Sequence, residues 1–110
     1  MQISIRSVDD ATILDISGDI DLANSPEMRK ALLREARDNR RPRVVLNLSE
    51  VRYIDSSGVA SLVESLKASR DMGSRFILVG LSGPAREVLQ LSRLLKVFET
   101  YATEVEALVA

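Results

Sequence analysis

Short apolar runs alternate along this chain with longer stretches in which apolar residues recur every three or four positions. The run from Val44 to Leu48 is rich in branched residues, which is the pattern of a strand buried on both faces. A stripe with helical spacing follows, made of Val59, Leu62, Val63 and Leu66. The pattern therefore predicts a buried strand and a helix from about Ser57 to Asp71, joined by the turn Asp55 to Gly58.

Two alternating segments at the start of the chain predict an antiparallel hairpin that turns at Asp9 and Asp10. Its apolar positions are Ile3, Ile5, Val8, Ile13, Leu14 and Ile16. After Gly18, the segment Asp19 to Leu22 predicts a short extended piece with two carboxylates on one face. Such charge is typical of a half-exposed edge strand, which it protects from wrong pairing.

A first helix is predicted to begin with Ser25 as its cap and Pro26 at the first helical position, where the missing N–H costs nothing. Its buried face consists of Met28, Ala31, Leu32 and Ala36. Five arginines gather towards its end: Arg34, Arg37, Arg40, Arg41 and Arg43. Because cations commonly interact with the helix dipole on a solvated face, we prefer that role to phosphate binding.

The second half of the chain repeats the strand and helix pattern. Gly73 follows Met72 at the expected end of the long helix, since glycine is common just past a helix C-terminus. Phe76 to Val79 predicts another buried strand. The loop Gly80 to Gly83 then leads to Pro84 at the start of a third helix.

The last quarter of the chain predicts the rest of this third helix, a short strand and a final helix. The apolar face of the third helix comprises Ala85, Val88, Leu89 and Leu91 to Leu95. Lys96 to Phe98 is a candidate short strand, and Thr103 can cap the final helix. The apolar residues of that helix are Val105, Leu108 and Val109.

This succession predicts one α/β domain over residues 1–110, with a mixed, mostly parallel sheet, an N-terminal antiparallel hairpin and about four helices. Sites in such sheets gather at the carboxyl ends of the strands. We therefore expect three loops to meet there: Asp19 to Ser25, Asp55 to Gly58, and Gly80 to Gly83.

The turn between the central strand and its helix allows two interpretations. Asp55, Ser56 and Ser57 can simply cap the helix by accepting hydrogen bonds from its first N–H groups. Alternatively, a serine hydroxyl at the positive end of the helix dipole can accept a phosphoryl group. Gly58 is expected to provide the backbone freedom for a tight turn.

The composition excludes several kinds of chemistry. The chain has no cysteine and no histidine, which removes disulfides, Ser-His-Asp triads and the commonest metal ligand. With 4% aromatic residues and a net charge of −1, no direct binding to nucleic acid is expected. No apolar stretch of about twenty residues and no signal-peptide pattern is present, so we expect a cytoplasmic protein without membrane insertion.

The acidic residues raise the question of an enzyme. Asp19, Asp21 and Asp55 are of the type that holds magnesium or acts in acid–base catalysis. However, nucleotide-binding and zinc-binding motifs are absent, as are a basic phosphate clamp and a second catalytic partner. We interpret the carboxylates as a polar docking surface, and we expect no enzymatic activity, cofactor or metal.

Several segments together resemble the STAS domain of bacterial anti-sigma-factor antagonists. They are Gly18 to Asp21, Val45 to Leu48, Ile54 to Val59, Ser82 with Pro84 and Ala85, and Leu94 to Phe98. The resemblance covers nearly the whole chain, and Asp-Ser-Ser-Gly between a strand and a helix is its most specific part. In this chain Gly83 separates Ser82 from Pro84, whereas members of the family often have Ser-Pro directly.

The resemblance implies a partner-switching regulator. The unmodified domain would bind an anti-sigma factor that is also a serine kinase, so that the sigma factor is released. Phosphorylation of Ser57, or alternatively of Ser56, would break the complex, and a PPM-type phosphatase would restore it. The partner-binding residues implied are Asp21, Asp55, Ser56, Ser57, Gly58, Val59 and Ser82.

Two other functions are kept open. Similar STAS domains are regulatory subunits of lipid-transport ABC systems, in which the same turn contacts an ATPase. A small-molecule binder or Asp-dependent enzyme would instead need a pocket under the three loops. Because the periodic faces account for most apolar residues, we expect a monomer in the absence of partners.

Overall fold

Five strands form one mixed sheet in the computed structural model of the protein, which describes residues 1–110. The strands are β1 (Gln2–Val8), β2 (Ala11–Ser17), β3 (Arg43–Glu50), β4 (Arg75–Val79) and β5 (Glu99–Tyr101). They are ordered β1-β2-β3-β4-β5; β1 and β2 are antiparallel, and the remaining pairs are parallel. The predicted fold class is therefore confirmed, including the hairpin.

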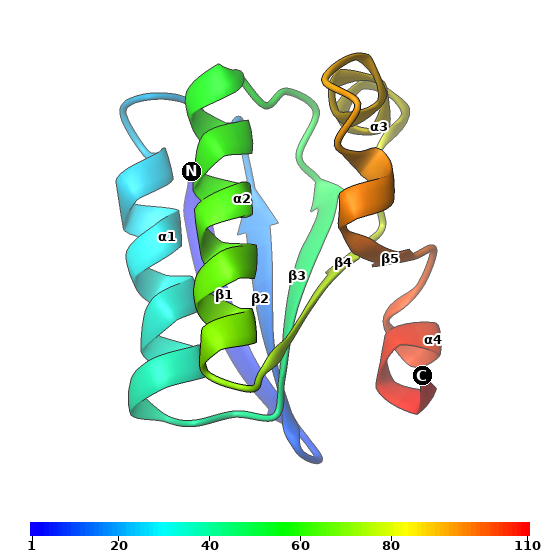
Figure 1. The fold of residues 1–110 in the computed structure, drawn as a ribbon. Helices are drawn as coiled ribbons and strands as arrows, with labels where there is room; N and C mark the ends of the chain where they lie inside the picture. Colours follow the sequence, from blue (N-terminus) through cyan, green and yellow to red (C-terminus); the bar gives the residue numbers. More distant parts are fainter.

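Four α-helices accompany the sheet (Figure 1). They are α1 (Ser25–Leu33), α2 (Ser56–Asp71), α3 (Gly83–Leu91) and α4 (Glu104–Val109). Helices α1 and α2 lie side by side against one face of the sheet (Figure 1). A π-helical segment, Arg34–Asp38, continues α1, and a 3₁₀ turn, Leu95–Val97, precedes β5. No helix combines the length and apolar character needed to cross a bilayer.

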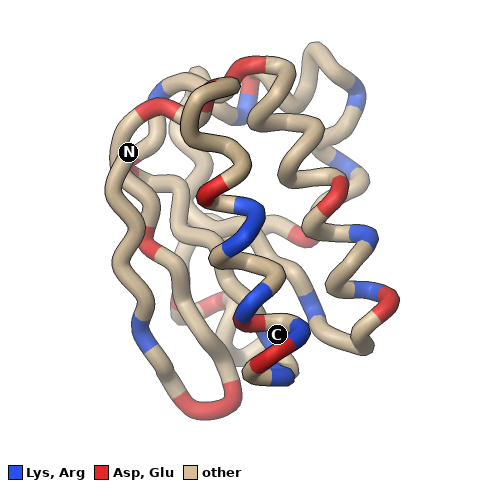
Figure 2. Tube along the Cα trace, turned by 90° about the vertical axis from the view of Figure 1, so that its left-hand side faces the viewer, with Lys and Arg blue, Asp and Glu red and all other residues tan.

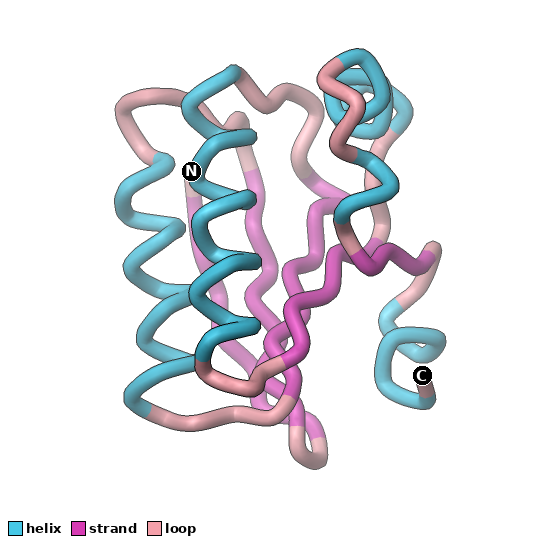
Figure 3. Tube along the Cα trace, in the orientation of Figure 1, coloured by secondary structure: helices cyan, strands magenta, loops and turns pink.

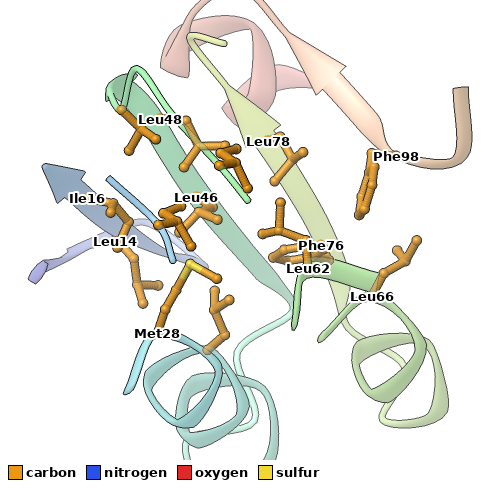
Figure 4. Close-up of a cluster of buried hydrophobic side chains, with 14 of the residues drawn as sticks. Leu14, Ile16, Met28, Leu46, Leu48, Leu62, Leu66, Phe76, Leu78 and Phe98 are labelled. Carbon is orange, nitrogen blue, oxygen red and sulfur yellow. The ribbon is translucent and has the colours of Figure 1, made fainter. Parts of the chain in front are cut away.

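The core lies mainly between the sheet and the helices α1, α2 and α3. Strand residues Leu14, Leu46 and Leu78 face Met28 of α1 and Leu62 of α2 there (Figure 4). Because side chains alternate along a strand, the neighbouring strand residues face the other side. There, Ala107 of α4 covers a smaller cluster of Ile13, Val45, Ile77 and Val79. Both faces of β3 and β4 are thus buried, as their apolar runs predicted.

The segment Asp19 to Leu22 is not the edge strand that its alternation predicted. Only Ile20 pairs with another extended residue, in an isolated parallel bridge to Ile54, and the chain then turns. Ile20 is fully buried whereas Leu22 is 73% exposed. The helix cap is also shifted by one residue, because Asn24 is the N-cap of α1 and Ser25 is its first, buried residue.

The third helix ends earlier than its apolar residues predicted. Leu91 is the last residue of α3 and is 78% exposed. Arg93 has a positive φ of 59°, and the Leu94 N–H donates to the Leu89 carbonyl at 2.9 Å. This is a Schellman helix end in which arginine occupies the position usually held by glycine, so no glycine marks the end of this helix. The following strand is consequently Glu99–Tyr101 and not Lys96 to Phe98.

Two of the five clustered arginines do not have the expected role at the C-terminal end of the first helix. Arg41 donates to the carbonyls of Asp9 and Ala11, at 3.1 and 2.7 Å. Arg43 donates to the carbonyls of Ala107 and Leu108, at 2.9 and 2.7 Å. These side chains join distant elements, which helical spacing alone does not reveal.

Candidate functional site

Asp55 starts helix α2. Its backbone is extended, and its Oδ1 accepts a hydrogen bond from the Gly58 N–H at 2.9 Å. Its carbonyl accepts the first intrahelical bond, from the Val59 N–H at 3.0 Å. This is the geometry of a side-chain N-cap, so the capping role predicted for the turn belongs to Asp55.

The second carboxylate oxygen of Asp55 holds a neighbouring loop. Oδ2 accepts a hydrogen bond from the Leu22 N–H at 3.0 Å. Ile20 adds two backbone bonds, donating to the Tyr53 carbonyl at 2.9 Å and accepting from the Asp55 N–H at 3.0 Å. The loops after β2 and β3, which lie at the same end of the molecule (Figure 3), are therefore tied together as predicted.

The third loop, Gly80 to Gly83, contacts the segment of the chain that precedes the turn Asp55 to Gly58. The Ser82 hydroxyl donates to the Val51 carbonyl at 2.7 Å, and Ser82 Oγ accepts from the Ala85 N–H at 3.2 Å. Ser82 is thus the N-cap of α3 and also holds the chain that leads from β3 to the turn. Gly83, the residue that departs from the family pattern, is the first residue of α3.

Ser56 and Ser57 occupy the first two positions of the 16-residue helix α2. Neither hydroxyl forms a hydrogen bond within the chain, in contrast to the hydroxyl of Ser82. Ser56 is exposed and Ser57 is half-buried. Because Asp55 already caps the helix, both hydroxyls are chemically available.

Gly58 is required for a different reason from the one expected. It is helical without a positive φ, so the turn does not depend on unusual backbone freedom. A Cβ at this position would lie 2.7 Å from Ile54 Cγ2 and 2.8 Å from Ile20 Cγ2. Gly58 therefore permits the close approach of the two loops, while the neighbouring Val59 is buried in the core.

Asp21 closes its own loop. Its Oδ1 accepts from the N–H groups of Ala23 and Asn24, at 3.0 and 3.2 Å. The Asn24 side chain in turn accepts from the Asp21 N–H at 2.8 Å and donates to the Asp19 carbonyl at 2.8 Å. No three acidic side chains are grouped so that they could hold a metal ion, and Asp21 and Asp55 instead order the backbone of the site.

Two exposed side chains beside the turn were not predicted as site residues. Leu22 is 73% exposed and Tyr53 is 52% exposed, although both backbones are held by the hydrogen bonds described above. The sequence did not indicate their exposure, because the alternation of residues up to Leu22 is typical of a half-buried strand. None of the cavities in the structure is lined by the three loops, so geometry does not support the small-molecule alternative.

The sequence pattern of the STAS domain matches residues 2–107. The chain belongs to the STAS domain family. As a STAS domain it is 25% identical to an anti-sigma F factor antagonist of Paenibacillus polymyxa, over 98% of this chain and 92% of that protein. It is 32% identical to an anti-sigma-B factor antagonist of Staphylococcus aureus, over 83% of this chain and 84% of the relative.

Solved structures agree with this assignment. The crystal structure of an anti-sigma factor antagonist from Mycobacterium paratuberculosis superposes with a TM-score of 0.86, at 25% identity over 98% of this STAS domain and 91% of that chain. The phosphorylated form of a Bacillus cell fate determinant, SpoIIAA, has a TM-score of 0.74 at 22% identity, over 97% and 96% of the two chains. At that identity the second likeness concerns the fold alone.

Proposed function

We propose that this STAS domain is an anti-sigma factor antagonist whose binding is switched off by phosphorylation of Ser57. The observation that carries the proposal is the pair of unbonded hydroxyls at the start of α2, beside a cap already supplied by Asp55. The names of the relatives support the class of partner, an anti-sigma factor. In our proposal this partner is also the serine kinase, and a PPM-type phosphatase reverses the modification.

The position of Ser57 suits a phosphate on the free domain. A phosphoserine adds about −1.5 to −2 charges and three acceptor oxygens. The first N–H groups of a helix lack intrahelical partners, and α2 directs those of Ser56 and Ser57 to this end of the molecule. The modification should therefore be tolerated without unfolding the domain.

The same phosphate would oppose a bound partner. Asp55 is two residues away, and the loop that carries Asp21 is hydrogen-bonded to it, so the added charge would lie among carboxylates. Contact with a partner would also remove water from the phosphate, which costs free energy. A loss of about 3 kcal/mol would weaken binding more than about a hundredfold.

Capture from the native cell lysate tests the proposal. Wild-type protein, Ser57→Asp and the matched control Ser56→Asp are used as bait, and the intact mass of the native protein is measured. We expect wild type to retain an anti-sigma factor with a kinase domain, Ser57→Asp to lose it, and one phosphate to map to Ser57. Equal capture by all three proteins would show that Ser57 is not the switch.

Two other results of this experiment would change the proposal. A phosphate on Ser56, with loss of the partner in Ser56→Asp only, would move the acceptor by one residue. Recovery of an ABC ATPase and no phosphate would replace the proposed function by regulation of a transporter.

A further inference from the structure

Strand β1 (Gln2–Val8) is an outer strand of the sheet and pairs only with β2. Strand residues bond alternately to the two sides, so every second residue of β1 directs its N–H and C=O to an open edge. The register with β2 is continuous over all seven residues, without a bulge or a proline. β1 therefore presents a regular edge to which another strand can be added.

The usual features that protect an edge strand are missing here. Proteins blunt such edges with bulges, prolines or charged side chains. The only charged residue of β1 is Arg6, and its guanidinium is engaged by Asp15 and by Glu104 of α4, both at 2.6 Å. The neighbouring Ile5 is instead 47% exposed. An edge strand without these features is a ready template for pairing with another chain, and Ile5 adds an apolar contact beside it.

A groove lies between this edge and α1. It has a volume of about 220 Å³ and is lined by Ile3, Ile5, Glu27, Lys30, Ala31 and Arg34, which we call the β1–α1 groove. Its floor is apolar, since Ile3 and Ala31 pack against the core. Lys30 and Arg34 form no ion pair, and Glu27 is the only acidic residue in the groove. Figure 2 shows the basic segments of α1 beside the hairpin.

We propose that β1 binds an extended segment of a partner protein that carries both apolar and acidic residues. The backbone of this segment would add a strand to the open edge. Its side chains on the α1 side would place an apolar residue over Ile5 and a carboxylate near Lys30 and Arg34. The unpaired cations of the groove supply the charge complementarity for an acidic segment.

A second copy of this chain fits the groove less well. Two β1 strands paired antiparallel about a twofold axis perpendicular to the sheet would put both α1 helices on the same face. The charged residues of the groove, Lys30 and Arg34 against Glu27, carry a net positive charge in each copy, so two copies that meet there would repel each other. The occupant we propose is therefore a different, acidic chain.

Titration of ¹⁵N-labelled protein with designed peptides tests this inference. The probe is Val-Thr-Glu-Thr-Val-Thr-Glu-Thr, blocked at both ends, which presents valine and glutamate on one face of a strand. The control peptide has lysine in place of glutamate. We expect the glutamate peptide to shift β1 and α1 resonances and to slow amide exchange along the outer edge of β1, and the lysine peptide to bind more weakly.

Charge reversal in the protein provides the second arm. Lys30→Glu/Arg34→Glu should weaken binding of the glutamate peptide about tenfold and favour the lysine peptide. Lys67→Glu/Arg86→Glu changes the net charge equally at exposed positions of α2 and α3 and should leave binding unchanged. Thermal unfolding of both variants establishes that they are folded.

Several outcomes would overturn the inference. They are binding of neither peptide, equal binding of both, an equal effect of the two charge reversals, and resonance shifts that map outside β1 and α1. If the free protein sediments as a dimer and its β1 amides are protected from exchange, the occupant of the edge is a second copy of this chain and not an acidic partner. Because none of these measurements involves Ser57, their failure would leave the proposed switch untouched.

Discussion

Among the glycines of the chain, Gly58 has the least room for a side chain. Gly58→Ala would force a Cβ to within 3 Å of Ile20 and Ile54, and such overpacking destabilises a protein by about 1–3 kcal/mol. Chemical denaturation should show this loss as a lower midpoint. Because both isoleucines hold the loops of the site, partner capture should weaken as well.

Gly83→Ala is the matched control. Gly83 also lies in the first turn of a helix, but nothing lies within 4 Å of the position of its Cβ. Alanine there should be neutral or should stabilise by about 0.5 kcal/mol, because it restricts the unfolded chain. Equal effects of the two substitutions would mean that close packing is not the reason for glycine at Gly58.

Among the elements, α4 depends on arginines that reach it from the sheet. Arg43 of β3 donates to the carbonyls of Ala107 and Leu108, and Arg75 of β4 donates to that of Ala110 at 2.9 Å. A six-residue helix has little stability of its own. Arg43→Met should therefore lower the free energy of unfolding by about 1–3 kcal/mol and speed amide exchange in α4. Arg40→Met, at an exposed position without an ion pair, should change neither the stability nor the exchange rates.

Elements with strong periodicity could be predicted from the sequence, and elements set by distant contacts could not. The apolar run of β3 and the stripe of α2 identified both elements correctly, because burial selects those patterns. The end of α3 was missed because Arg93 adopts a conformation that usually requires glycine. The segment Asp19 to Leu22 was wrongly interpreted as an edge strand, because its order comes from hydrogen bonds to Asp55, which lies more than thirty residues later.

For the candidate site, the residues of the turn were predicted, but which of them caps the helix and which have free hydroxyls was not. The strand–turn–helix pattern located Asp55 and the two serines, and topology brought the first two loops together as expected. Which side chain caps the helix depends on rotamers and neighbouring loops, which a local pattern does not contain. The exposure of Tyr53, likewise, follows only from how the chain leaves β3.

The stability of the whole domain should depend on pH through Asp15. The hydrogen bond from Arg6 lowers the pKa of Asp15 below its usual value of 3.8, and a hydrogen bond from Asn47 acts in the same direction. The stabilisation is therefore present above the unfolded-state pKa and is lost as the pH falls through the folded-state pKa. Since Arg6 also pairs with Glu104, the loss would loosen β1, β2 and α4 together.

Chemical denaturation at pH 7 and pH 3 checks this dependence. Asp15→Asn should be less stable than wild type at pH 7, and the gap should narrow at the lower pH. Asp71→Asn, an exposed position without an ion pair, serves as the control and should follow wild type at both values. A constant gap between wild type and Asp15→Asn would contradict the role given to Asp15.

The hydrogen bonds that hold Leu22 and Tyr53 also bear on the speed of recognition. A partner that docks on this end of the molecule meets two apolar side chains whose backbones are already fixed. Little ordering entropy remains to be lost, and no loop has to fold before contact is made. Association should then proceed at rigid-body rates of about 10⁵–10⁷ M⁻¹ s⁻¹. Competing partners would be distinguished mainly by how long each complex lasts.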